Sequence, residues 1–253
     1  NPELYFQVKL YTGNGTDDTA ITLDGDENMS PNLIWIKPRN DARGHHLQDT
    51  IRGVNNALII NESSAEYTGL SNVIKSFDSD GFTLGTSNDI NKSSNTHVAW
   101  CWKETADAGF DIVSYTGNGS NQSVSHSLSA VPHLIIQKSL ANGTGWWVYH
   151  QSLGATKAIY MHDSSSPAGS FTNDWLQDTA PTSSVFTLDN NSDTNASSQA
   201  MIAYLWSEKQ GFSKFGSFVS NNTSDNAFIY TGFAPSMVFM KSTTSTNNWV
   251  IQD

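Results

Sequence analysis

The sequence predicts an all-β protein built from tandem modules, and three observations predict it. Charged residues make up only 15% of the chain, while aromatic residues make up 11% and include eight Trp. Such a composition is typical of uncharged, loop-rich β structure, since helices usually carry more Glu, Lys, Leu and Ala. Short runs of Val, Ile, Phe, Trp, Tyr and Thr alternate with Gly, Asn, Asp and Ser, as strands alternate with turns. The third observation is internal repetition.

The repetition appears when the chain is compared with itself. Residues 11–15, Tyr-Thr-Gly-Asn-Gly, recur at 115–119, and residues 99–102 recur in pattern at 203–206. The run Pro-x-Leu-Ile-x-x-Lys or its equivalent begins at Pro31, Pro132 and Pro235. The matches keep their order at an offset of 101 to 104 residues. Chance similarity would not preserve that order, so we interpret the chain as repeats of one module.

Three segments follow from these matches. Segment one is residues 7–105, segment two is residues 109–209, and segment three is residues 211–253. Segment three aligns with less than half of a module. We therefore expect either that a longer protein continues the module or that the half-module completes a sheet elsewhere, because an isolated half would expose unpaired strand edges.

The strands expected in segment two follow from its apolar runs. They are residues 111–115, 133–137, 146–149, 158–161, 185–188 and 200–206. The continuous apolar runs at 134–136 and 237–240 predict strands covered on both faces. Residues 72–77 are expected to form one short helix. Six or more strands in about 100 residues predict one β-sandwich per module. Jelly-roll-like, lectin-like and immunoglobulin-like layouts remain open, as does one sandwich shared between segments.

Charge and cysteine content limit the function classes. The net charge is −11, the three Arg lie in one short stretch, and the Lys are scattered. Nucleic acid and anionic membrane surfaces are therefore not expected partners, since both require clustered cations. No apolar run reaches the roughly 20 residues of a membrane-spanning helix, so membrane insertion is not expected either. The single cysteine, Cys101, lies in an apolar run and is expected in the core.

Aromatic residues are the candidate ligand-binding groups. Trp146 and Tyr149 flank Trp147 and Val148, and Trp175 lies beside acidic residues. Such rings stack on sugars when exposed. Trp147 is aligned with Trp249 and is expected to occupy a repeated core position, which leaves Trp146 as the exposed ring. The competing interpretation places all of these rings in the core of a Trp-rich module.

Oxygen-rich loops are the candidate metal sites. Asp189, Asn191 and Asp193 alternate as calcium ligands do, although the loop lacks the glycine and glutamate of a calcium-binding loop. The acidic run 24–28 and the pair His45-His46 have no counterparts in segment two, so a solvated loop and a strand edge are the expected interpretations. No cofactor is expected, with calcium as the alternative. No Gly-x-Ser-x-Gly elbow or opposed acid pair stands out, so no enzyme is expected.

An ordered set of motifs carries a family resemblance. It comprises Tyr-Thr-Gly-Asn-Gly, Pro-x-Leu-Ile-x-x-Lys, residues 146–154, 183–188 and 211–216. This set resembles an uncharacterised repeat module of bacteriophage virion proteins, often from marine phages. The resemblance implies a structural or receptor-binding role in a tail fibre or surface appendage. The implied partners are other virion proteins, copies of the chain and a host surface glycan, at the virion surface or outside the cell. A carbohydrate-binding lectin-like module and a self-assembling extracellular structural protein are the alternatives.

Overall fold

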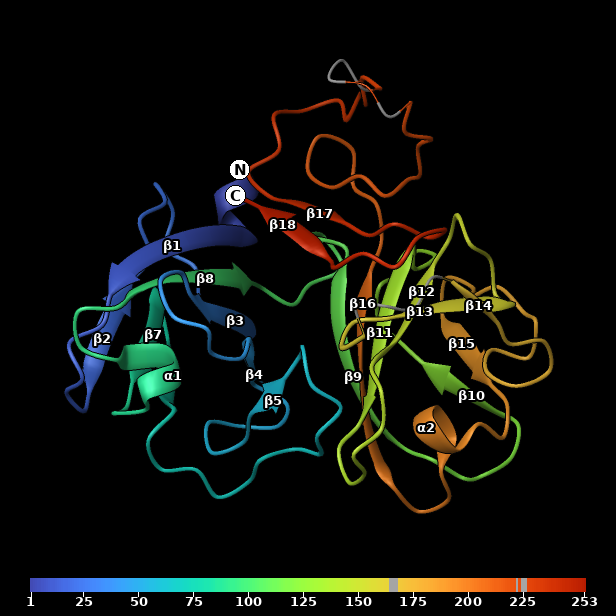
Figure 1. The fold of residues 1–253 in the computed structure, drawn as a ribbon, viewed down its shortest axis with the longest axis horizontal. Helices are drawn as coiled ribbons and strands as arrows, with labels where there is room; N and C mark the ends of the chain where they lie inside the picture. Colours follow the sequence, from blue (N-terminus) through green and yellow to red (C-terminus); the bar gives the residue numbers. More distant parts are fainter. Residues whose placement is uncertain (164–167, 222, 224–226) are drawn as a thin grey trace.

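The protein is all-β, with several antiparallel sheets and almost no helix (Figure 1). A computed structural model describes residues 1–163, 168–221, 223 and 227–253. None of the helices in these ranges has the length and hydrophobicity needed to cross a membrane.

Segment one contains a five-stranded and a three-stranded sheet. The larger sheet has the order β1 (Phe6–Thr12), β8 (Thr96–Trp102), β3 (Leu33–Pro38), β4 (His46–Asp49) and β5 (Leu58–Ile59). The smaller sheet has the order β2 (Thr19–Thr22), β7 (Gly81–Leu84) and β6 (Ile74–Asp78). Every pairing in both sheets is antiparallel.

In the described residues, segment two has the same strand order, with one further edge strand in the large sheet and one strand fewer in the small sheet. Its large sheet consists of β9 (Phe110–Thr116), β16 (Ala200–Trp206), β11 (Leu134–Ser139), β12 (Trp147–His150), β13 (Lys157–Tyr160) and β14 (Gly169–Ser170). Its small sheet pairs β10 (Gln122–Ser125) with β15 (Val185–Leu188). In segment three, β17 (Val238–Met240) and β18 (Val250–Gln252) form a hairpin.

The strand predictions for segment two are within two residues of the observed bounds. The helix predicted at 72–77 is wrong, because β6 occupies that stretch and pairs with β7. There Ile74 packs in the same cluster as Phe82 and Leu84, and such tertiary packing decides short ambiguous segments. Three short helices were not predicted: η1 (Pro2–Leu4), α1 (Asn88–Asn91) and α2 (Ser192–Asn195).

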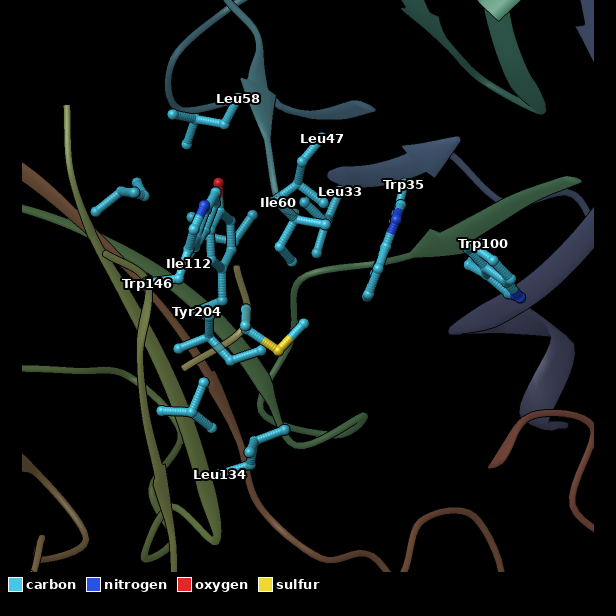
Figure 2. Packing of buried hydrophobic residues seen from close by; sticks show 14 of the residues in the cluster. Leu33, Trp35, Leu47, Leu58, Ile60, Trp100, Ile112, Leu134, Trp146 and Tyr204 are labelled. Carbon is cyan, nitrogen blue, oxygen red and sulfur yellow. The ribbon is translucent and has the colours of Figure 1, made fainter. Parts of the chain in front are cut away.

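Three hydrophobic clusters form the core. The central cluster lies between the two large sheets, where Leu33 and Trp35 face Leu134 and residues around Trp146 (Figure 2). Alternate residues of the same strands pack outward against the small sheets, as Ile34 does with Phe82. Strands β3 and β11 are therefore covered on both faces, as predicted for residues 134–136.

The prediction for residues 237–240 differs from the structure. Residues Met237, Val238, Phe239 and Met240 are only half-buried. The physical reason is that β17 has one neighbouring strand in the described residues, whereas β3 and β11 have two. Cys101 is fully buried on β8, and burial raises the pKa of its thiol far above the ordinary value. Its place in the core agrees with the prediction.

Candidate functional site

The repeated Tyr-Thr-Gly-Asn-Gly motif forms the same turn in segments one and two. In segment one, the Asn91 side chain on α1 accepts from the Asn14 amide at 3.0 Å and donates to the Thr16 carbonyl at 2.8 Å. In segment two, Asn195 on α2 makes the equivalent contacts with Asn118 and Ser120, at 3.0 and 2.7 Å. A buried amide that satisfies main-chain groups in this way holds a loop rather than a ligand.

The glycines of this motif are required by the geometry. A Cβ on the first glycine, Gly13 or Gly117, would lie 2.4 or 2.2 Å from a main-chain oxygen of the segment that follows the short helix. The second glycine, Gly15 or Gly119, has a φ of +73°. Only glycine adopts that conformation without strain. The motif therefore specifies a turn in both segments.

The aromatic residues predicted to bind a ligand lie in the core. Trp146 and Trp175 have no exposed surface, and Tyr149 is 3% exposed. The Trp175 indole donates to Gln137 at 2.6 Å inside the second segment. These three side chains are therefore not accessible to stack on a sugar ring. The correction has a physical cause, because the strands of segment two bury their rings and branched side chains between sheets.

Strand register also corrects the alignment of the Trp residues. Trp147 pairs with Gln137, His46 with Ile36, and Val250 with Met240. Trp147 therefore corresponds to His46 and Val250, and Trp146 corresponds to His45 and Trp249. The sequence alignment of Trp147 with Trp249 is wrong by one residue. In a strand, one residue moves a side chain to the opposite face.

The corrected alignment reveals a contact that occurs twice between segments. The Trp146 indole of segment two donates to the Ile59 and Glu62 carbonyls of segment one, at 3.3 and 3.0 Å. The Trp249 indole of segment three donates to the Tyr160 carbonyl of segment two at 2.7 Å. Ile59 and Tyr160 occupy the same register position, opposite His46 and Trp147. Each Trp therefore binds the same place on the preceding segment.

A second contact between segments is also repeated. The Glu66 amide of segment one donates to the Leu140 carbonyl of segment two at 2.9 Å. The Ala168 amide of segment two donates to the Thr243 carbonyl of segment three at 3.3 Å. The offset between equivalent atoms is 102 or 103 residues, in agreement with the sequence repeat. The segment-one to segment-two interface and the segment-two to segment-three interface therefore share their main-chain geometry.

A buried ionic cluster joins segments one and two. Asp49 has no exposed side-chain surface and accepts from Arg52 at 2.6 Å and from the Tyr204 hydroxyl of segment two at 2.7 Å. Arg52 also contacts Glu66 at 3.1 Å. Burial raises the pKa of Tyr204 well above its ordinary value, so the hydroxyl remains a donor. Every charge in the cluster has an opposite partner, which is the condition for burying ions.

The predicted calcium loop is used to cap α2. The Asn191 side chain accepts from the Asp193 and Thr194 amides at 2.9 and 3.3 Å. The Asp193 carboxylate accepts from the Trp147 indole at 3.2 Å, and the Asp189 carboxylate accepts from the adjacent amide. These oxygens are directed at the protein rather than at a common point. Within the described ranges, no three His, Cys, Asp or Glu side chains are grouped to hold a metal.

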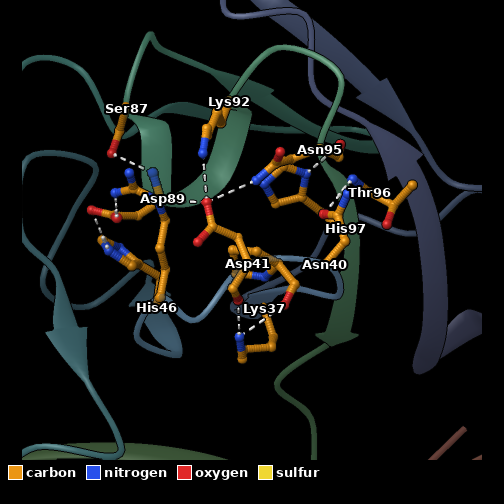
Figure 3. A network of polar contacts seen from close by, with 12 residues as sticks. Lys37, Asn40, Asp41, His46, Ser87, Asp89, Lys92, Asn95, Thr96 and His97 are labelled. Carbon is orange, nitrogen blue, oxygen red and sulfur yellow. Dashed lines mark hydrogen bonds and ion pairs between the residues drawn. The ribbon is translucent and has the colours of Figure 1, made fainter.

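A strongly charged cluster lies in segment one, around α1 (Figure 3). Asp89 contacts His46 at 3.4 Å and Arg43 at 2.7 Å, and both contacts hold its pKa below the ordinary value. Asp41 contacts Lys92 at 2.7 Å, and the hydrogen bonds from Lys92 and Asn95 lower its pKa to about 2. Two carboxylates thus neutralise two cations, and the cluster ties the loop after β3 to α1.

His46 and Trp147 show how the segments diverge at this cluster. His46 contacts Asp89 on α1, while the corresponding Trp147 donates to Asp193 on α2. The neighbouring His45 is largely buried, which lowers its pKa to about 4, and its neutral ring accepts from the Trp35 indole at 3.0 Å. Neither histidine is directed at a metal site. The acidic run 24–28 is likewise tied to β1 and η1, since the Gly25 amide donates to Gln7 and the Asp26 amide donates to Glu3.

The comparisons with known proteins give one family. A family model described as a domain of unknown function, DUF7483, matches residues 1–253. The chain belongs to this family. No curated protein and no solved structure matches the chain significantly. The polar contacts that recur in this DUF7483 chain include those between segments. Sequence reasoning missed them, and the available signal was the spacing of 103 residues between Trp146 and Trp249 (249 − 146), which lies within the repeat offset.

Proposed function

We propose that this chain is a non-enzymatic structural and adhesion protein of a phage virion, built from tandem β-sandwich modules. The virion assignment depends on the sequence resemblance. The architectural part is carried by one observation, the equivalent Trp contacts made by Trp146 and Trp249 with the preceding segment. An interface that recurs along a chain lets repeats add length without a new fold for each unit.

The residues shared by the segments support this architectural role. Lys37 donates to the Pro38 and Asp41 carbonyls, and Lys138 donates to the Ser139 and Asn142 carbonyls. Asn91 and Asn195 hold the same turn. Each shared polar side chain therefore satisfies main-chain groups. Any adhesion surface lies where the segments differ, above all at the charged cluster of Arg43, Asp89 and Lys92.

The proposed setting is the virion surface, in a tail fibre or other appendage, with virion proteins or copies of the chain as partners. The test is mass spectrometry of purified particles combined with immunogold microscopy, using antibodies raised against this chain. We expect the protein in the particles and label on an appendage. Detection in infected-cell lysate but never in purified particles would contradict the proposal.

A host glycan is the proposed receptor class, and it requires a surface other than the predicted aromatic platform. Trp146, Tyr149 and Trp175 are buried, so a lectin-like function has no support from these rings. A glycan array tests the receptor, with Arg43→Ala as the variant at the charged cluster. Equal binding by the variant and the parent chain would exclude this surface.

A further inference from the structure

Asn-Gly pairs occur at residues 14–15, 118–119 and 142–143. Each pair is followed by Thr or Ser, so the three local sequences are alike. An Asn in this position can lose its side-chain amide when the next main-chain nitrogen attacks the side-chain carbonyl carbon, because glycine has no Cβ to block the approach. The two reacting groups must be free to meet, so the fold decides which of the pairs can react.

The pairs at 14–15 and 118–119 are held in the repeated turns. The side-chain oxygen of Asn14 accepts from the Thr16 amide at 2.8 Å. The side-chain oxygen of Asn118 accepts from the Ser120 amide at 2.8 Å, and the Gly119 amide donates to a main-chain carbonyl of α2 at 2.8 Å. Attack by the glycine nitrogen would have to break these contacts, which hold the Asn side chain against its own main chain.

The pair at 142–143 is not held in this way. Asn142 and Gly143 are exposed in the loop that follows β11. Within the described ranges, neither the Asn142 side chain nor the Gly143 amide makes a hydrogen bond. The contacts of Asn142 are main-chain contacts, with Lys138, Ser139 and Thr144. The two reacting groups can therefore approach each other without the loss of a hydrogen bond.

Asn142 of segment two occupies the position that Asp41 has in segment one. The Lys37 ammonium donates to the Asp41 carbonyl at 2.9 Å, and the Lys138 ammonium donates to the Asn142 carbonyl at 3.1 Å. Burial lowers the pKa of Lys37, and the charge of Asp41 opposes this by raising it. Segment one therefore carries a carboxylate near its lysine where segment two carries a neutral amide.

In the residues that the structure describes, the Lys138 ammonium has only uncharged acceptors. Lys138 is 1% exposed and donates to the Ser139 and Asn142 carbonyls at 2.8 and 3.1 Å. Burial lowers the pKa of Lys138 to about 8, and the charge of Asp193 opposes this by raising it. A buried charge is unfavourable unless an opposite charge accompanies it. A carboxylate at position 142 would therefore stabilise this ammonium.

We propose that Asn142-Gly143 is a self-modification site, at which deamidation places a carboxylate beside the buried Lys138 ammonium. The Gly143 nitrogen forms a bond to the side-chain carbonyl carbon of Asn142, the bond from that carbon to the side-chain nitrogen breaks, and the Gly143 proton leaves with this nitrogen as ammonia. A cyclic imide remains. One water adds to either imide carbonyl and opens the ring, which gives Asp or isoaspartate. The inference is independent of the virion assignment.

Both products bring the new charge to the same ammonium. In the Asp product, the carboxylate takes the position of Asp41 in segment one. In the isoaspartate product, the main chain runs through the former side-chain carbonyl, and the former main-chain carbonyl of residue 142 becomes the carboxylate. That carbonyl is the one that accepts from Lys138 at 3.1 Å.

The cations that bind the carboxylate in segment one have no counterparts in segment two. Lys92 directly follows α1, and the residue that directly follows α2 is Ala196. Arg43 lies two residues after the carboxylate in segment one, and Thr144 occupies that place in segment two. The new charge therefore has Lys138 as its counter-charge.

The first test is peptide mapping by mass spectrometry after the full chain has been kept in mildly alkaline buffer. Deamidation exchanges NH₂ for OH and changes the peptide mass, and chromatography separates Asp from isoaspartate. In the folded chain we expect conversion at Asn142 to be about tenfold faster than at Asn14 or Asn118, whose reacting groups are held. In urea the three rates should be similar. Equal rates in the folded chain, or faster conversion in either turn, would overturn the proposal.

The second test examines the charge without the reaction. Asn142→Asp carries the charge of the product, Asn142→Ser is its neutral control, and Asn121→Asp adds a charge at another exposed asparagine. We expect a higher Tm and a higher Lys138 pKa, measured by NMR of the lysine side chain, in Asn142→Asp alone, because a nearby opposite charge favours the ammonium. If Asn142→Asp and Asn142→Ser agree in both measurements, the pairing with Lys138 is wrong. Neither test uses particles or glycans, so this proposal and the proposed function can fail separately.

Discussion

Replacing Asp49 by Asn should be among the most destabilising single changes in this protein. The Asp49 carboxylate has no exposed surface and accepts four hydrogen bonds. One oxygen accepts from Arg52 Nε at 2.6 Å and from the Tyr204 hydroxyl at 2.7 Å. The other accepts from the main-chain amides of Ile51 and Arg52 at 3.1 and 2.9 Å. An amide in its place has only one accepting atom.

The expected cost follows from those contacts. In either orientation, the NH₂ group introduced by Asp49→Asn would face two donors, and Arg52 would keep only Glu66 as its buried counter-charge. Breaking a buried ion pair by neutralising one partner costs about 3–5 kcal/mol. We therefore expect the free energy of unfolding to fall by about that amount. Urea denaturation measures it, and an unchanged m-value would show that the unfolding transition is the same.

A surface ion pair provides the control for this prediction. Asp24 contacts Lys9, and its side chain is 70% exposed. Exposed pairs contribute little to stability, so Asp24→Asn should leave the urea midpoint unchanged. The reasoning would be refuted if Asp49→Asn shifted the midpoint no more than Asp24→Asn. Combining Asp49→Asn with Tyr204→Phe should cost less than the sum of the single changes, because both remove one shared contact between segments.

Three further outcomes follow from the structure. Trp146→Phe removes the single indole N–H that donates to both the Ile59 and the Glu62 carbonyl of segment one, and it should lower the free energy of unfolding by about 1–3 kcal/mol because buried groups lose this donor; an unchanged urea midpoint would contradict a stabilising role for the repeated contact. Asn91→Ala and Asn195→Ala should each destabilise by about 2–4 kcal/mol because buried main-chain groups lose partners, whereas the exposed Asn190→Ala should not; calorimetry compares the three. Burial, followed by the hydrogen bond with Asp111, raises the pKa of Glu104 from 4.5 to about 7. The folded state therefore binds this proton more tightly than the unfolded state, and the stability gained from it is lost as pH rises from about 4.5 to 7. Glu104→Gln should flatten the dependence of the free energy of unfolding on pH in that window, and an unchanged slope would assign the pH dependence to another group.

The strands and turns could be predicted from sequence because local chemistry specifies them. The apolar run 134–136 is covered on both faces, and the two Asn-Gly turns have the positive φ that glycine allows. Strand β10 was missed because it has one apolar residue, Val124, among polar ones. Helices α1 and α2 were missed because four residues give no periodicity, although their caps, Ser87 and Asn191, are ordinary capping residues.

The site could not be predicted in the same way, because it depends on register and on contacts between distant residues. An alignment error of one residue exchanged the roles of Trp146 and Trp147 and suggested an exposed ring where the structure has a buried one. The pairing of Asp49 with Tyr204 spans 155 residues. Neither composition nor spacing indicates such a contact. What the sequence did contain was the repeat, and the repeat is what made the two Trp contacts recognisable as equivalent.

The two interfaces share main-chain contacts but differ in side-chain chemistry. At the first interface, Asp49 and Arg52 form a buried ion pair that binds Tyr204. At the corresponding place in segment two, His150 contacts the ring of Phe215 from segment three at 6.5 Å. The first interface therefore depends on the Tyr204 hydroxyl as a donor to a buried charge, whereas the second depends on the packing of two rings, and loss of a donor to a buried charge is the more costly change.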